Sequence, residues 1–362
     1  MKYVFLFYFF IIGNFTNAQM IPNECATKSS LTDHLKLIPA QDMRMLPGTK
    51  VIKMNLVIYA DDNGSNLAMT EEEVKNEIRF TDSVYNIGDI CFSIVGFEFI
   101  NSTTKNNPEL YQDYTNEARS GAFNVFIVNS ILLNSVPTGT FGWAPNTPSY
   151  YMVIKKIGFG TRRTFIHEMG HSLGLHHTFK GTAHDVDNPG IDELVNASNG
   201  TTAGDFVQDT PADPYIRCGN PGNTNGCTFP YVAPSCEDAN NSSYSPSMTN
   251  YLSYMANLGC LRTTFTVGQF SRMRTTIDND ATLTSYLAPD NLDFYNTTIS
   301  GIWDLRAAKY QIRLGNIYGT GNVTILNNTR GTYSASFVTL KPGLVVSPNA
   351  NGVVRFLGSN CQ

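Results

Sequence analysis

The stretch that decides the fold reads His167-Glu168-Met169-Gly170-His171-Ser172-Leu173-Gly174-Leu175-His176-His177. Four of the chain's six histidines lie within it. Residues four apart on a helix share a face, so His167 and His171 can offer their imidazoles to one metal ion. Gly174 can take a positive φ that ends the helix, and the reversed chain then returns His177 as a third ligand. His176 competes for that place, but only His177 has the right distance from Gly174.

Three histidines leave one position of a tetrahedral zinc ion open for water, which is typical of a catalytic site. Glu168 follows the first ligand, where its carboxylate can reach such a water without binding the metal. Zinc lowers the pKa of the water to about 7, so Glu168 can accept its proton during attack on a carbonyl and return the proton to the leaving amine. A helix with incidental histidines is the alternative, and the complete spacing disfavours it. The stretch therefore predicts one catalytic zinc ion with Glu168 as general base.

The N-terminus has the pattern of a secretory signal peptide. A charged start precedes an apolar run from Tyr3 to Ile12, and small Ala18 follows as a cleavage-like end. A run of about ten residues is too short for a bilayer, which needs about 20. We expect residues 1–18 to be removed, the protein to be secreted without a membrane span, and residues 19–47 to form a pro-segment or N-terminal arm. A buried N-terminal strand is the alternative.

The composition is that of a mildly acidic protein with enough apolar residues for a sizeable core. Of 362 residues, 42% are hydrophobic and 15% are charged, and the formal net charge is -5. No basic tract could follow a phosphate backbone, so nucleic acid is not expected as a partner. The length favours one large and one smaller unit. The oligomeric state does not follow from the sequence.

Hydrophobic periodicity predicts helices and strands up to residue 288 and mainly strands beyond it. Residues 48–288 are expected to form an α+β domain, and residues 289–362 a small β-rich domain. The turn-rich stretch 178–247 predicts a long functional or cross-linked loop region. The expected strands are Lys50–Tyr59, Cys91–Ile100, Asn124–Ile131 and Tyr150–Ile157, and the expected helices are Thr70–Tyr85, Arg162–Leu175 and one that begins near Thr266 with a capping box to Gln269.

The number of cysteines, seven, is odd. An oxidising compartment lets disulfides persist, and two of them would replace missing core in the loop region. Four cysteines permit three pairings, and the spacing alone chooses none. The loop cysteines are Cys218, Cys227, Cys236 and Cys260, and the scattered ones are Cys25, Cys91 and Cys361.

The histidine motif, Asp209-Thr210-Pro211 and Asn250-Tyr251-Leu252-Ser253-Tyr254 together resemble the metzincin clan of zinc proteases, and most closely its pappalysin family. The resemblance covers roughly residues 50–288. It implies a metzincin-type domain with a twisted mixed sheet, an active-site helix and a loop-rich C-terminal subdomain. It also implies endopeptidase activity on protein or peptide substrates.

The resemblance assigns roles to residues after the third ligand. In the family a methionine-containing turn lies under the zinc, and a tyrosine two residues later stabilises the oxyanion of the reaction. Tyr254 matches this tyrosine, with an ordinary core tyrosine as the alternative. Leu252 stands in the methionine position, and its similar volume should keep the floor of the site intact. Relatives often select a basic substrate residue with aspartates that Met255–Gly259 lacks, so we expect no preference for cleavage next to Arg.

The resemblance also extends to the cysteines and to calcium. Cys25-Ala26-Thr27 is similar to the family's pro-segment motif, in which a thiolate occupies the zinc and keeps the zymogen inactive. A disulfide from Cys25 to Cys91 or Cys361 is an equal alternative. The family further implies bridges of Cys218 with Cys236 and of Cys227 with Cys260, and structural calcium near Asp205 to Asp213.

Two functions from different classes fit these features. The first is an active zinc endopeptidase. The second is a zinc-containing but inactive binding or adhesion protein that acts through its C-terminal β domain. Glu168 favours the first, because a structural zinc site has no use for a base there, while Leu252 in the methionine position is the one hint of the second.

Overall fold

The computed structural model describes residues 48–156, 163–181, 192–215, 229, 236–254, 261–300, 303–315, 322–326, 329–335, 337–342, 344–346 and 353–358. The expected signal peptide and pro-segment lie outside these residues, as do Cys25, Cys218, Cys227, Cys260 and Cys361. Within the described ranges, no helix has the length and apolar character needed to cross a membrane.

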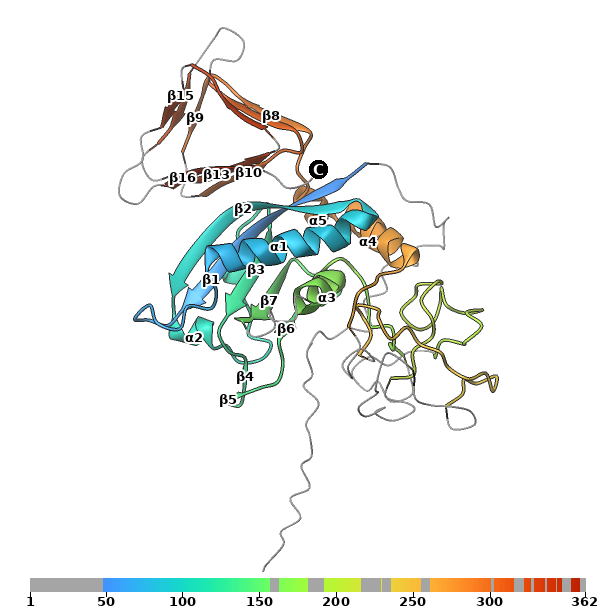
Figure 1. Ribbon diagram of the computed structural model, residues 1–362. Helices are drawn as coiled ribbons and strands as arrows, with labels where there is room; N and C mark the ends of the chain where they lie inside the picture. Colours follow the sequence, from blue (N-terminus) through green and yellow to red (C-terminus); the bar gives the residue numbers. More distant parts are fainter. Residues whose placement is uncertain are drawn as a thin grey trace, which may run out of the picture.

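A twisted five-stranded sheet forms the centre of the α+β domain (Figure 1). Its strand order is β2-β1-β3-β7-β6, and every neighbouring pair is parallel except β6 and β7. The mixed sheet expected from the sequence is therefore present. The strands are β1 (Lys50–Ala60), β2 (Ile90–Asn101), β3 (Phe123–Val128), β6 (Gly142–Trp143) and β7 (Tyr151–Lys155), and a separate short pair consists of β4 (Leu132–Leu133) and β5 (Val136–Pro137).

Strand β3 ends three residues earlier than Ile131, the expected end. The backbone N–H groups of Asn129 and Ser130 donate to the carbonyl of Asn106 at 2.9 and 3.2 Å, so they leave the sheet ladder. Apolar Ile131 is nevertheless buried, because the chain folds back over the sheet. Hydrophobicity alone cannot separate these two kinds of burial.

Helices cover one face of the sheet. The capping boxes of Thr70 with Glu73 and of Thr266 with Gln269 begin the two longest helices, the second as expected from the sequence. Even-numbered residues of β1, such as Met54 and Leu56, pack beneath these helices in the largest core cluster. The helices are α1 (Glu71–Tyr85), α2 (Thr103–Asn106), α3 (Arg163–Ser172), α4 (Val267–Asn279) and α5 (Ala281–Ser285).

The opposite face of the sheet is also covered, which explains why β1 is apolar almost throughout. Val57 and Tyr59 point to this face, where they pack with Phe126 and Trp143 and with residues of the 110–131 segment. A sheet buried on both faces gives a rigid frame for the helix that carries the histidines.

After α5, the described residues contain strands and no further helix. Nine strands form three parallel sheets, in the orders β8-β11-β14, β9-β12-β15 and β10-β13-β16. Each strand pairs with the strand three places later, so the chain winds through three coils of a three-sided solenoid (Figure 1). Its strands are β8 (Asn291–Phe294), β9 (Thr297–Ile299), β10 (Trp303–Ala307), β11 (Gln311–Leu314), β12 (Val323–Ile325), β13 (Arg330–Ala335), β14 (Phe337–Leu340), β15 (Leu344–Val346) and β16 (Val353–Gly358).

The solenoid packs on the sheet face that lies away from the helices. Leu305 and Ala307 of β10 share a buried cluster with Val51, Cys91 and other apolar residues of that face. A hydroxyl contact of 2.9 Å joins Ser93 of β2 to Ser334 of β13. The solenoid therefore supports the sheet from behind, and Arg355 of β16 also reaches Glu71 of α1 at 3.6 Å and the ring of Phe97.

Candidate metal centre

Helix α3 ends in the turn that the histidine motif requires. The N–H of Leu175 donates to the Gly170 carbonyl at 2.9 Å, and the N–H of Gly174 donates to the His171 carbonyl at 2.9 Å. These two bonds form a Schellman motif, with Gly174 at a φ of +95°. Leu175 lies beyond this turn, which is why the helix is shorter than the expected Arg162–Leu175.

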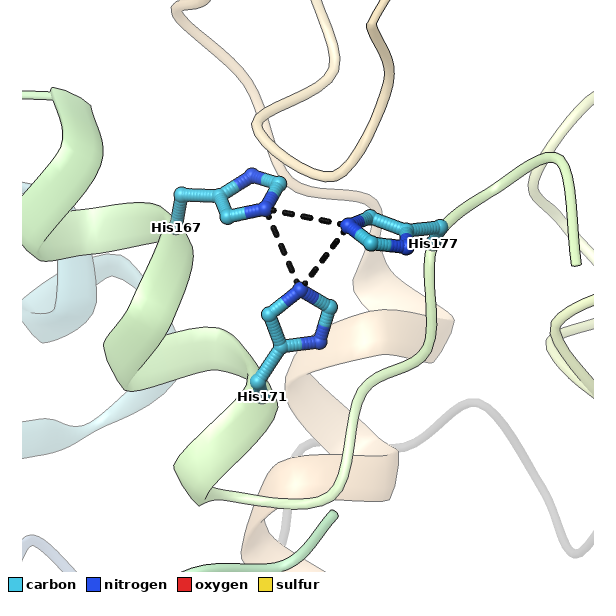
Figure 2. A group of neighbouring side chains, drawn as sticks. All are labelled: His167, His171 and His177. Atoms are coloured by element: carbon cyan, nitrogen blue, oxygen red, sulfur yellow. Dashed lines mark hydrogen bonds between the residues drawn. The ribbon is translucent and has the colours of Figure 1, made fainter. Parts of the chain in front are cut away.

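The turn brings three imidazoles together (Figure 2). His167 and His171 come from consecutive turns of α3, and His177 reaches them from the chain that follows it. Their Nε2 atoms lie 3.1–3.2 Å apart, and all three side chains are buried. Among the described residues, they form the only group of three His, Cys, Asp or Glu ligand atoms within 4.8 Å of one another.

Backbone carbonyls orient two of the rings. The Nδ1 of His167 lies 2.6 Å from the Tyr251 carbonyl, and the Nδ1 of His171 lies 2.8 Å from the Leu175 carbonyl. A carbonyl can only accept, so both Nδ1 atoms carry the proton and both Nε2 atoms present lone pairs to the centre. Converging lone pairs repel each other unless a cation lies between them.

The donor set fits zinc. In a tetrahedral centre with Zn–N bonds of about 2.0–2.1 Å, neighbouring nitrogens lie about 3.3 Å apart, close to the spacing of the three Nε2 atoms. Burial lowers the pKa of all three imidazoles, that of His171 to about 4. The rings are therefore neutral near pH 7, as metal ligands must be.

Glu168 is completely buried on α3, directly after the first histidine. Its side chain passes over Gly142 of β6, where an added Cβ would lie 3.2 Å from the Glu168 Cγ and 2.9 Å from the Val153 carbonyl oxygen. The absence of a side chain at Gly142 thus leaves room for the side chain of Glu168.

Tyr254 lies beside the histidines, as the resemblance implied. Its ring centre is 4.8 Å from that of His177 and 5.9 Å from that of His167. Phe179 stacks on His177 at 4.6 Å and contacts Tyr254 at 4.9 Å. The aromatic rings around the third histidine restrict its orientation.

Leu252 forms the floor beneath the ligand helix. It is fully buried, and its Cδ2 would lie 3.1 Å from a Cβ added to Gly170, between the two histidines of α3. The same turn is anchored by Asn250, whose amide exchanges hydrogen bonds of 2.8 and 3.2 Å with that of Gln269. Gln269 therefore caps α4 and also holds the turn, a second role that its sequence position does not indicate.

Asp213 is a supporting residue that the sequence analysis did not identify in this role. Its carboxylate accepts the hydroxyls of Thr178 and Ser253 at 2.6 and 2.7 Å and the N–H of Tyr215 at 3.0 Å. Thr178 follows the third histidine and Ser253 precedes Tyr254, so one buried carboxylate fixes both segments. Burial raises its pKa despite these bonds.

A second group of carboxyls is buried farther along the loop region. Burial raises the pKa of Glu193 to about 9, with the charge of Asp205 as the next cause, and burial raises the pKa of Asp205 to about 7. Asp205 also accepts the Thr210 hydroxyl at 2.8 Å. No three ligand atoms converge here among the described residues, so calcium near Asp205 to Asp213 stays a prediction.

Comparisons with known proteins agree with this site. Residues 112–278 match the Pregnancy-associated plasma protein-A family. Pappalysin-1 of Mus musculus is 29% identical over 167 residues, which are 43% of this chain and 9% of that protein. Pappalysin-1 of Homo sapiens is 33% identical over 121 residues, which are 33% of this chain and 6% of that protein. The chain thus spans only a small part of the length of these two relatives.

An extracellular metalloprotease of Verticillium alfalfae is 23% identical over 233 residues, which are 56% of this chain and 75% of that protein. Among solved structures, mature mirolysin of Tannerella forsythia in complex with a cleaved peptide is 18% identical, with a TM-score of 0.45 over 66% of this chain and 95% of that one. The family match contains the complete histidine motif and the turn before Tyr254, so residues 112–278 resemble the metallopeptidase domain of the pappalysin family, which supports a metzincin-type protease.

Proposed function

We propose that this chain is a secreted zinc-dependent endopeptidase with His167, His171 and His177 as its metal ligands. The observation that carries the proposal is the convergence of three neutral imidazole nitrogens beside the buried Glu168. The metallopeptidase match supports protein or peptide substrates. The signal-like N-terminus and the extracellular relative support secretion.

When bound, zinc supplies a Lewis acid that makes an attacking water molecule more acidic. The Glu168 carboxylate would orient that water, accept its proton and transfer the proton to the nitrogen of the leaving amine. The Tyr254 hydroxyl would donate to the substrate carbonyl oxygen as negative charge develops there. Leu252 and Asp213 would act only on position, by holding the ligand helix and the two segments that flank the site.

Replacement of Glu168 tests this proposal directly. Glu168→Gln should retain one zinc per chain but lose about 10²- to 10⁴-fold in kcat on an unfolded protein substrate, because the amide cannot accept the proton. Zinc is measured by elemental analysis and turnover by fragment release. Equal rates for both proteins would favour the inactive binding protein instead.

Two adjacent histidines provide a matched test of the ligand set. His176 and His177 are both buried, but only His177 points to the other two imidazoles. His177→Gln should lower zinc affinity by at least about 10- to 100-fold, the range seen even for residues that only support ligands. His176→Gln should keep zinc, and loss of the metal from His176→Gln alone would overturn the assignment.

We further propose that Cys25 keeps the precursor inactive by occupying the metal. Cys91 and Cys236 are disulfide-bonded and belong to separate core clusters. Cys361 follows the end of β16 by three residues, a reach of about 10 Å. Strand β16 pairs with β13, which contacts β2 two residues from Cys91. A Cys91 to Cys361 bridge would leave the Cys25 thiol available.

Peptide mapping and precursor activity separate the two roles of Cys25. Cys25→Ala should give a precursor that cleaves substrate early, since a thiolate on the metal displaces the catalytic water. Mapping of the inactive precursor should recover Cys91 linked to Cys361. A bridge from Cys25 to either cysteine would rule out the proposed latency.

A further inference from the structure

The last coil of the solenoid leaves its apolar core exposed. The side chains that point into the solenoid form columns, with one residue from each coil. Three such residues of the second coil are completely buried, whereas the residues aligned with them in the third coil are 36–52% exposed. The aligned pairs are Leu314 with Leu340, Ile325 with Val346, and Tyr333 with Phe356. The core of the solenoid is therefore open at its third coil.

The first coil covers the opposite end with a charged residue. Arg306 stands in the same column as Tyr333 and Phe356. Its guanidinium carbon lies 5.8 Å from the centre of the Phe294 ring, which packs on the solenoid core. An inward-pointing charge is a common protection against further strands, because stacking would bury it. The two ends of the solenoid therefore differ in kind.

The strands of the third coil also have one free edge each. Within the described part of the chain, β14, β15 and β16 each pair only with a strand of the second coil. Their other edges present backbone N–H and C=O groups to a further strand. Arg355 is the one charged residue in these three strands, and its side chain is directed to Glu71 and to the Phe97 ring. No charge of these strands therefore opposes the stacking of another coil.

We propose that the open end of the third coil is the interface for a second copy of this chain, and that the two solenoids meet end to end. A partner must present three strand edges in the same triangular outline, and a second copy of this coil does so (Figure 1). A two-fold axis perpendicular to the solenoid makes the facing edges antiparallel, so that all three sheets continue from one copy into the other.

The size and the asymmetry of the solenoid favour a closed dimer. The third coil presents about 20 residues to its copy, which is the number per side in stable interfaces. Arg306 disfavours stacking of a first coil on a third coil, so association ends at two chains and does not continue into a filament. Residues 359–362, which follow β16, contain no large apolar side chain that would cover the open end.

The mass of the chain in solution tests the proposal. The full-length Glu168→Gln variant is used, so that peptidase activity does not shorten the chain, and its mass is measured by light scattering at several concentrations. We expect a dimer that separates into single chains on a denaturing gel without reductant. A chain that stays monomeric up to about 100 µM would overturn the proposal, because interfaces of this size bind with micromolar or lower Kd. Oligomers that grow with concentration would overturn the closed dimer.

Two substitutions by arginine distinguish the open end from other surfaces. Phe356→Arg places in the third coil the residue that covers the first coil, and it should halve the mass. Phe337 is 69% exposed and aligned with Gln311 on the outer side of β14, so Phe337→Arg should remain dimeric. Far-UV circular dichroism checks that both variants fold. A folded Phe356→Arg that remains dimeric would contradict the proposal.

Hydrogen exchange locates the interface without any substitution at the open end. At concentrations at which the dimer forms, amides of β14, β15 and β16 should exchange more slowly than in the dilute monomer, whereas amides of β8 and β9 should be unchanged. This measurement decides if Phe356→Arg does not fold. Protection confined to other strands would show that the chains associate elsewhere.

Discussion

The ligand helix and the loop region 192–254 position their site residues by different means. His167 and His171 are held by the hydrogen bonds of α3 and by packing against a sheet that is buried on both faces. Tyr254 lies in a region whose described residues contain no helix or strand. Its position depends on buried side chains such as Asp213 and Asn250, which bond to the neighbouring segments. Buried polar groups there replace the backbone ladder of a regular element.

The largest loss of stability should come from the contact between Leu252 of the loop region and Gly170 of the ligand helix. Leu252→Ala opens a cavity beneath Gly170 and should lower the free energy of unfolding by about 2–5 kcal/mol. Leu252→Met conserves volume and should cost less than about 1.5 kcal/mol. Urea unfolding and zinc affinity measure both effects. An alanine variant with unchanged stability and zinc binding would show that this floor does not support the helix.

A buried carboxylate should contribute more to stability than an exposed carboxylate that accepts the same number of hydrogen bonds. Asp213 and Asp113 each accept three hydrogen bonds, but only Asp213 is buried. Asp213→Ala leaves buried donors without an acceptor and should cost about 2–4 kcal/mol and weaken zinc binding through Thr178. Asp113→Ala should cost about 1 kcal/mol or less and leave zinc binding unchanged. If both variants lost similar amounts of stability, the hydrogen bonds of Asp213 would support the loop region no more than those of an exposed carboxylate do.

Substitution of two glycines distinguishes the cost of backbone strain from the cost of close packing; one of them, Gly174, ends α3. Gly174 and Gly121 both have positive φ, but a Cβ at Gly174 would overlap the side chain of Thr276, whereas Gly121 has open space. Gly121→Ala should cost about 1–2 kcal/mol from the left-handed backbone alone. Gly174→Ala should cost about 1 kcal/mol more, because the overlap adds to the strain. Thermal unfolding of the two variants compares these costs, and equal losses would mean that Thr276 moves freely.

The smallest expected effect is a pH dependence of stability, which comes from the buried Asp82 of α1. Burial raises the pKa of Asp82 to about 7, and its carboxylate accepts the Phe92 N–H at 2.8 Å. The carboxyl of an Asp in the unfolded chain has a pKa of about 3.9. Between about pH 4 and pH 7, the folded state therefore keeps a proton that the unfolded state has released. Asp82 therefore lowers stability as pH rises from about 4 to 7. Asp82→Asn keeps an acceptor and should make the melting temperature less dependent on pH in this window; an unchanged slope would contradict the raised pKa.

Sequence predicted the parts of the site that depend on local spacing. The interval from His167 to His171 and the glycine before His177 determine the three-histidine geometry within eleven residues. The capping box at Thr266 is equally local, and the structure confirms it. Tyr254 was found only by resemblance, because its place beside the three histidines depends on a loop more than seventy residues away from the ligand helix.

The features that sequence missed join distant segments. The bond from His167 to the Tyr251 carbonyl spans 84 residues, and that from Ser253 to Asp213 spans 40. Neither leaves a local pattern, since Asp and Ser are common in turns for other reasons. The solenoid was missed similarly: short strands predicted β structure, but each partner lies a full coil later, beyond the reach of a period-two pattern.

The coiled C-terminal part gives this protein a way to change length without changing its chemistry. Strands β10 and β13 of the first two coils pack on β2, whereas the third coil rests on the second and reaches Phe97 of β2 and Glu71 of α1 through Arg355. In such a stack each coil interacts mainly with its neighbours, so the addition of a coil at the far end is a local event. Evolution can therefore lengthen this rod repeat by repeat while selection on the peptidase proceeds independently.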